Sequence, residues 1–224
     1  MTNNHESILF EDIYLSLKQD ILWLRLKPRE FLTESFLAEK FETSKTPVRQ
    51  ALLRLSYDGL VTVFPRRGYC VSEISLDDIQ EMHEYRYILE NTCLLKAIER
   101  IHADELAHLD SLSYKDRLYY ENEPPRFAKK PEKVERDSQF HIYLAELGGN
   151  RIIYEQLVKT LEKLQRLMLC AAEEEYMTKG LDEHHQLVLL IRDKKTKAAQ
   201  ELLHHHINEV YEHCADLNNI NKIF

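Results

Sequence analysis

The segment between Leu37 and Leu52 constrains the fold more than any other part of the chain, because it reads as a helix, a tight turn and a second helix. Ser44 is a favoured N-cap residue whose hydroxyl accepts from free backbone N–H groups, and Pro47 is tolerated in a first helical turn. An apolar stripe at helical spacing follows, formed by Val48, Ala51, Leu52 and Leu55. The pattern predicts a helix-turn-helix.

The opposite face of this second helix is polar near its N-terminus, where it carries Lys45, Thr46, Arg49 and Gln50. Recognition helices place their base-reading side chains in that region. Two further helices are predicted upstream, an amphipathic one over 7–26 that ends before Pro28 and one over 34–41.

A hairpin is predicted after the second helix. Gly59 ends the helix, a β-branched and aromatic run covers 60–64, and Pro65 to Gly68 form a turn before a returning strand at 69–71. The turn contains Arg66 and Arg67, which suit phosphate or minor-groove contact, while Gly68 allows close backbone approach. Together these elements predict a winged helix.

The net charge of -8 argues against nucleic-acid binding only if it is spread evenly. Residues 1–74 contain ten Lys or Arg and ten Asp or Glu, so the acidic excess lies entirely in 75–224. Within 40–67 six basic residues face two acidic ones. The local balance is what a phosphate backbone senses, so DNA binding is favoured.

This head resembles the winged helix of GntR-type bacterial regulators. The matching motif includes Leu37-Ala38-Glu39, Ser44 to Arg49, Ala51-Leu52, Arg54-Leu55, Gly59-Leu60-Val61 and Arg67-Gly68. The resemblance and the pattern together indicate DNA contacts from Ser44, Lys45, Thr46, Arg49, Arg54, Arg66, Arg67 and Gly68. Two positions depart from the family: Arg29 stands where glycine is usual, and Lys45 replaces a common arginine, which weakens bidentate contact with guanine.

The rest of the chain predicts helices only, at about 75–101, 103–120, 132–147, 150–175, 179–192 and 195–215, the first capped by Ser75. The expected fold is therefore mainly α: a winged helix-turn-helix with a short β-hairpin over residues 1–74, followed over 75–224 by an all-α antiparallel bundle. The sequence contains no run of eighteen apolar residues and no secretory signal pattern. Four widely spaced cysteines are typical of free thiols in the cytoplasm.

Four polar residues of the bundle have the spacing of a metal site. Asp137 and His141 are four residues apart and share a helix face. His184 and His206 would lie about 33 Å apart on one helix, but a break near Lys194 would fold them back to the same level. Their helical neighbours are apolar, whereas His205 has polar ones. These residues fit either a metal site or a polar core.

The bundle is similar to the effector domain of FadR-like GntR regulators, through Arg86-x-x-x-Glu90, Asp137-x-x-Phe140-His141 and His206-Ile207. In its metal-binding members the corresponding Asp and three His hold a divalent ion. The resemblance thus implies a metal held by Asp137, His141, His184 and His206, open positions for the carboxylate of a small organic acid, and effector contact from Arg86. Zn²⁺, Ni²⁺ and Mn²⁺ all suit these ligands.

The leading hypothesis is a homodimeric, cytoplasmic transcription regulator that binds operator DNA and responds to a metal-bound carboxylate. One alternative is a regulator with a metal-free pocket for a larger apolar ligand, in which the histidines only line the pocket. Another is a metalloenzyme with a DNA-binding head, although the sequence shows no accompanying nucleophile or general base.

Overall fold

The computed structural model describes residues 2–73, 76–122, 130–171 and 174–216. It divides into two compact units, with the boundary between Ile74 and Ser75. We call residues 1–74 the head and residues 75–223 the body. The predicted cap at Ser75 lies outside the described residues.

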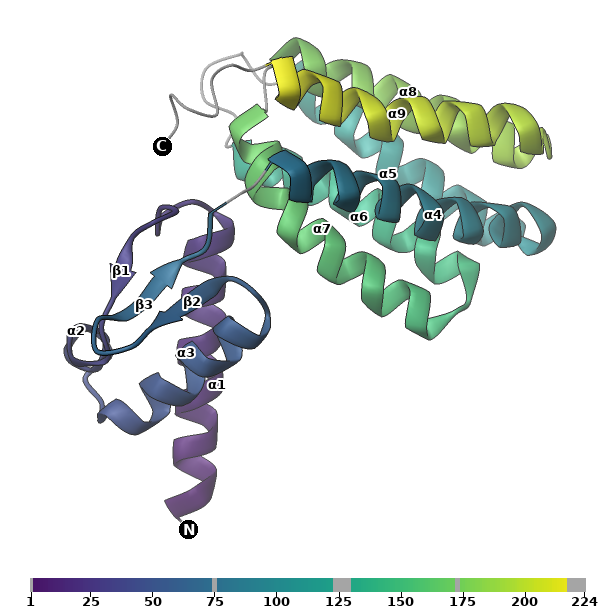
Figure 1. Cartoon of the computed structure of the whole chain (residues 1–224). Helices are drawn as coiled ribbons and strands as arrows, with labels where there is room; N and C mark the ends of the chain where they lie inside the picture. Colours follow the sequence, from purple (N-terminus) through teal and green to yellow (C-terminus); the bar gives the residue numbers. More distant parts are fainter. Residues whose placement is uncertain (1, 74–75, 123–129, 172–173, 217–224) are drawn as a thin grey trace. The chain divides into compact units, whose positions relative to one another are not determined.

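The head is a three-helix module with a small sheet (Figure 1). Its elements are α1 (Thr2–Leu22), β1 (Phe31–Leu32), α2 (Glu34–Lys40), α3 (Lys45–Tyr57), β2 (Val61–Phe64) and β3 (Gly68–Val71). The strands pair antiparallel in the order β1-β3-β2. The predicted apolar stripe of α3 is fully buried and packs with α1 into one core, at Val48, Ala51, Leu52 and Leu55.

Three details of the head differ from the sequence predictions. The first helix ends at Leu22 rather than near residue 26, because the chain enters a turn in which Leu24 has a φ of 56°. Strand β1 was not predicted, since two residues carry no readable alternation. Ser44 occupies the N-cap position of α3 with extended backbone, but its side chain makes no capping hydrogen bond.

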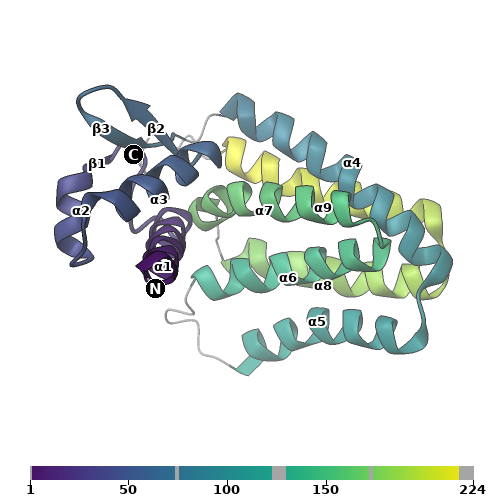
Figure 2. The ribbon, with the colours of Figure 1, turned by 90° about the horizontal axis from the view of Figure 1, so that it is seen from below.

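The body consists, over its described residues, of helices alone (Figure 2). They are α4 (Leu76–Arg100), α5 (Ala103–Asn122), α6 (Lys130–Gly148), α7 (Arg151–Ala171), α8 (Glu174–Arg192) and α9 (Thr196–Asp216). Helix α4 packs against α6, α7 and α9, while α5 packs against α6 and α8. The predicted break is present, because α8 and α9 are joined by a turn in which Lys194 has a φ of 53°.

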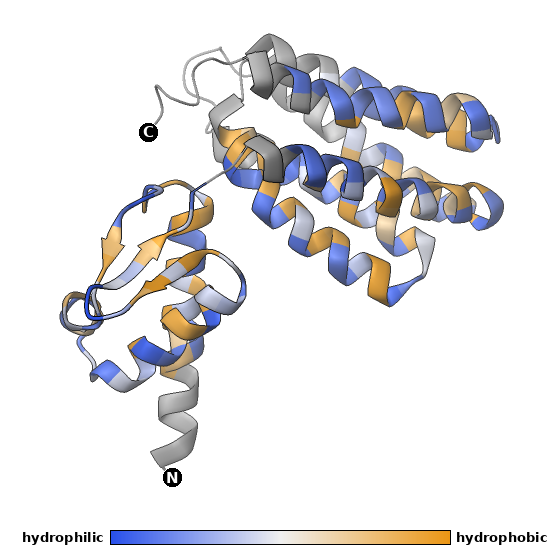
Figure 3. Cartoon of the chain, in the orientation of Figure 1, coloured by the Kyte–Doolittle hydropathy of each residue, from blue (hydrophilic) through white to orange (hydrophobic). Residues whose placement is uncertain are grey.

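Amphipathic sequences explain the packing of α7, α8 and α9, whose described residues include both apolar and polar stretches (Figure 3). The apolar faces meet in a core of fully buried side chains from five helices, among them Leu94, Leu109, Phe140, Ile191 and Leu203. The mainly α fold class is thereby confirmed. Within the described residues, no helix combines the length and the apolar character needed to cross a membrane.

Candidate functional site

The N-terminal end of α3 presents a polar surface. Ser44, Lys45, Thr46 and Arg49 are exposed there, while Pro47 and Val48 are buried. The predicted outward residues thus share one face. Arg49 is also anchored, because its Nε and Nη2 donate to the two carboxylate oxygens of Glu34 at 2.8 and 2.7 Å. Mainly through these hydrogen bonds, the pairing lowers the pKa of Glu34 and raises the pKa of Arg49.

Arg54, also predicted to contact DNA, is tied to α1. Its Nη1 donates to Glu11 at 2.6 Å, and its guanidinium lies 3.9 Å from the ring centre of Tyr14. These contacts hold α3 against α1, so Arg54 has a packing role that the sequence did not reveal.

The hairpin turn carries the other basic residues. Arg66 has a φ of 65°, and the Arg67 guanidinium stacks 4.6 Å from the ring centre of Phe31. Gly68 has a φ of 107°, and a Cβ there would lie 2.5 Å from the Leu32 carbonyl oxygen. Only glycine therefore permits the close approach of β1 to the start of β3.

In the body, four predicted ligands from three helices converge. The Nε2 atoms of His141, His184 and His206 form a triangle with sides of 3.1, 3.1 and 3.2 Å. The Asp137 Oδ1 completes the cluster, 3.5 Å from the His184 Nε2 and 3.9 Å from the His141 Nε2. All four side chains are buried. We call Asp137, His141, His184 and His206 the inner cluster.

Two carboxylates outside the inner cluster orient its imidazoles. The Nδ1 of His141 lies 2.7 Å from Glu90, and the Nδ1 of His206 lies 2.7 Å from Glu183. An ionised carboxylate only accepts hydrogen bonds, so each Nδ1 carries the proton and each Nε2 turns a lone pair inward. His184 is positioned instead by stacking, 4.1 Å from the ring centre of Phe140.

Burial favours the neutral form of the His141 and His184 imidazoles. The pKa of His141 is lowered mainly by burial, and the pKa of His184 falls well below its usual range through burial and then the neighbouring histidines. Burial would raise the pKa of Glu90, but Arg86 and His141 outweigh it and bring it to about 2. The Arg86 Nε donates to Glu90 at 2.5 Å, and both side chains are buried.

The donor set fits a divalent transition metal. Ligand atoms about 2.1 Å from a common ion lie about 3.0–3.4 Å apart, depending on whether the ligand angles are octahedral or tetrahedral. The imidazole triangle falls in that range, and Asp137 is slightly farther out. Neutral imidazoles oriented by carboxylates are the usual surroundings of such ions.

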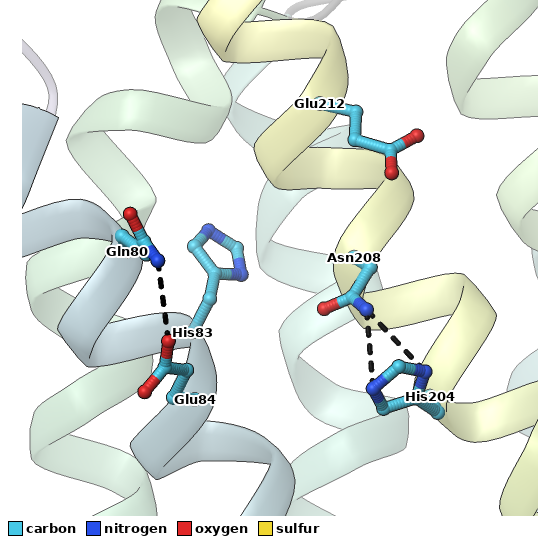
Figure 4. Close-up of a pocket in the computed structure, with 6 residues that line it drawn as sticks. All are labelled: Gln80, His83, Glu84, His204, Asn208 and Glu212. Carbon is cyan, nitrogen blue, oxygen red and sulfur yellow. Dashed lines mark hydrogen bonds between the residues drawn. The ribbon is translucent and has the colours of Figure 1, made fainter.

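A polar groove separates parts of α4 and α9, with a volume of about 310 Å³ (Figure 4). Its lining is Gln80, His83, Glu84, His204, Asn208 and Glu212. The His83 ring is buried, and burial together with the Arg86 charge lowers its pKa to about 3. The field of Arg86 therefore acts on this groove as well as on the inner cluster.

The model for bacterial regulatory proteins of the gntR family matches residues 9–71, and the model for the FCD domain matches residues 81–209. The chain belongs to the GntR family. It is 26% identical over 202 residues to the transcriptional regulator YdhC of Bacillus subtilis, with 89% of this chain and 88% of YdhC covered. It is 22% identical to the repressor RspR of Escherichia coli, with 95% and 91% covered.

Solved structures agree in fold. The structure of McbR from Escherichia coli superposes with a TM-score of 0.73 at 21% identity, covering 96% of this chain and 97% of McbR. The chain is thus a GntR-family transcriptional regulator with an FCD domain, and its curated relatives are named as regulators, not enzymes.

Sequence reasoning missed two residues that this FCD domain uses. Glu90 was part of the recognised motif, but no role was assigned to it. No role was predicted for Glu183, which directly precedes His184 and whose carboxylate reaches across to α9. Each carboxylate lies on a different helix from the histidine that it orients, so no sequence spacing pointed to either.

Proposed function

We propose that this GntR regulator controls operator affinity through a small carboxylate metabolite, bound at a divalent metal ion in the FCD domain. Asp137, His141, His184 and His206 would hold the ion, which would supply open coordination positions for the carboxylate. Binding would reorganise the helices of the body and alter how two heads of a homodimer engage successive half-sites. A coupling of about 1–3 kcal/mol is sufficient for such control.

The observation that carries this proposal is the imidazole triangle. The Nε2 atoms of three imidazoles lie within 3.2 Å of one another, and the carboxylate partners of His141 and His206 hold the proton of these two rings on Nδ1, so their Nε2 lone pairs face the centre, where a cation would bind them. Burial keeps the pKa of His141 and of His184 low, so protons on these rings are a poor substitute for that cation.

The charge of Arg86 supports an anionic effector. Its guanidinium is fully buried and lies near enough to lower the pKa of both His141 and His184. Glu90 compensates this charge through an ion pair. A metal ion adds positive charge to the same interior, and an organic acid would balance it.

Elemental analysis of the purified protein tests the metal. We expect about one equivalent of Zn, Ni or Mn per chain in the wild type and a loss of it in His206→Ala. His204→Ala is the matched control, because this exposed histidine lies on the same helix outside the inner cluster. Full metal occupancy in His206→Ala would refute the ligand set. Mass spectrometry of small acids released from the native protein would identify the effector.

A separate experiment tests the DNA contacts. Binding sites selected from random duplexes would be titrated with wild type, Arg49→Ala and Arg151→Ala. Loss of a bidentate base contact costs about 1–3 kcal/mol, so we expect roughly 5- to 150-fold weaker binding for Arg49→Ala. Arg151→Ala removes the same charge from an exposed site in the body and should bind normally. Equal affinity of all three proteins would exclude Arg49 from the interface.

A further inference from the structure

A second group of metal-ligating side chains lies beside the inner cluster, across the α8–α9 hairpin. It consists of Glu183 on α8 with His205 and Glu209 on α9, and we call it the outer cluster. One ligand atom from each residue lies within 4.8 Å of the others. The His205 Nε2 is 3.6 Å from a Glu183 oxygen and 3.9 Å from a Glu209 oxygen.

The hairpin positions these groups. His205 and Glu209 are four residues apart, so they stand one turn apart on the same face of α9. Helix α8 packs against α9 and brings Glu183 to the same level, because the turn at Lys194 folds the two helices together. The three ligands therefore come from backbone that the apolar core already fixes.

We propose that the outer cluster is a second divalent-metal site, with Zn²⁺ as the cation that best fits one imidazole and two carboxylates. For tetrahedral Zn²⁺ with ligand distances of about 2.1 Å, ligand atoms lie about 3.4 Å apart. The two observed separations exceed this by a few tenths of an ångström. His205 is half exposed, so rotation of its side chain closes the gap and water fills the remaining coordination.

Glu183 connects the two clusters. One of its oxygens accepts from the His206 Nδ1 at 2.7 Å, while the other faces His205 at 3.6 Å. A cation on the second oxygen draws electron density from the carboxylate and weakens the hydrogen bond that orients His206. Occupancy of the outer site thus lowers the metal affinity of the inner cluster, and linkage makes the effect reciprocal.

Zinc titration of the metal-stripped full-length protein by calorimetry at pH 7.5 tests this site. We expect two Zn²⁺ per chain for the wild type, one tight and one weaker. His205→Ala should keep only the tight ion, and His184→Ala only the weaker one. His204→Ala, which removes the adjacent exposed histidine, should keep both. Circular dichroism confirms that each variant is folded.

The outcomes separate the two sites, so the outer site does not depend on the proposed effector mechanism. A single ion lost in His205→Ala but kept in His184→Ala would support the outer site and contradict the inner one. Saturation of the wild type at one ion that His205→Ala retains would overturn the outer site. The outer site would also be overturned if the wild type and His205→Ala both bound two Zn²⁺ per chain.

Glu183→Gln tests the connection. Glu183 is a ligand of the outer cluster and also orients His206, so the variant should bind Zn²⁺ more weakly at both clusters. The affinity of the inner cluster should fall by about 10- to 100-fold, as when other residues that orient a metal ligand are replaced. His205→Ala should leave the affinity of the inner cluster unchanged, because the tight ion binds there while the outer site is still empty. Unchanged inner affinity in Glu183→Gln would overturn the coupling.

Discussion

Replacing Glu90 by glutamine should strongly destabilise the body, although the two side chains have nearly the same shape. Glu90 is buried and accepts from the Arg86 Nε at 2.5 Å and from the His141 Nδ1 at 2.7 Å. A glutamine amide has only one oxygen, so it can accept from only one of these two donors. Its N–H₂ group then faces the second donor, and that hydrogen bond is lost. The variant also removes the carboxylate charge that pairs with the Arg86 guanidinium.

Two arguments give the magnitude. Breaking a buried ion pair by removing one partner costs about 3–5 kcal/mol. Glutamine imitates a protonated glutamic acid, and the pKa of Glu90 is lowered from 4.5 to about 2. At about 1.4 kcal/mol per pKa unit, ionised Glu90 stabilises the fold by about 3 kcal/mol at neutral pH. Both arguments therefore predict a loss of about 3 kcal/mol.

The pH dependence has a definite sign. The folded-state pKa lies below the unfolded one, so the stabilisation is fully present above about pH 4.5 and is lost as the pH falls toward 2. Wild type and Glu90→Gln should therefore differ most near neutral pH. Their free energies of unfolding should converge in acid.

Urea unfolding with a chelator present measures this difference. With a slope of about 2 kcal/mol/M, the midpoint followed by circular dichroism should fall by about 1.5 M at pH 7. The single tryptophan, Trp23, lies in the head, and its fluorescence transition is an internal reference that should not move. Glu84→Gln on the exposed side of α4 is the matched control. A midpoint shift below about 0.4 M, or one that persists unchanged at pH 3, would refute the reasoning.

Three further predictions follow from the geometry. Gly68→Ala should lower the melting temperature of the head strongly, because its Cβ would meet the Leu32 carbonyl, whereas Gly59→Ala, with a φ of 75° and open space around it, should cost only about 1–2 kcal/mol. Gly148→Ala should cost about 1–3 kcal/mol in urea unfolding, because its Cβ would lie 2.8 Å from the side chain of Cys93. Chelation should lower the melting temperature of the wild type more than that of His184→Ala, which keeps only the weaker ion, as expected if the tight ion binds the folded state.

The fold was predictable wherever the sequence carries periodicity and chain breaks. The apolar stripe of α3 and the breaks near Gly59 and Lys194 placed the elements within a few residues. Strand β1 was not predictable, because its two residues form a strand only by pairing with Tyr69 and Cys70. The early end of α1 also depends on contacts that are distant in the sequence, since the Arg29 backbone N–H donates to the Val71 carbonyl oxygen and holds the chain beside the sheet.

The convergence of the four inner-cluster side chains was predictable from the sequence, but the carboxylates that orient two of them were not. A buried histidine that could ligate a metal is recognisable because it interrupts an apolar stripe, as His184 and His206 do. Its carboxylate partner stands on another helix and occupies an ordinary helical position, so one-dimensional spacing cannot connect Glu183 with His206, 23 residues away, or Glu90 with His141, 51 residues away. These pairs depend on how the α8–α9 hairpin and the α4–α6 contact are packed. Because Glu90 and Glu183 hold the protons of His141 and His206 on Nδ1, the packing of the helices, as well as the ligand set, would contribute to the affinity of the inner cluster for a cation.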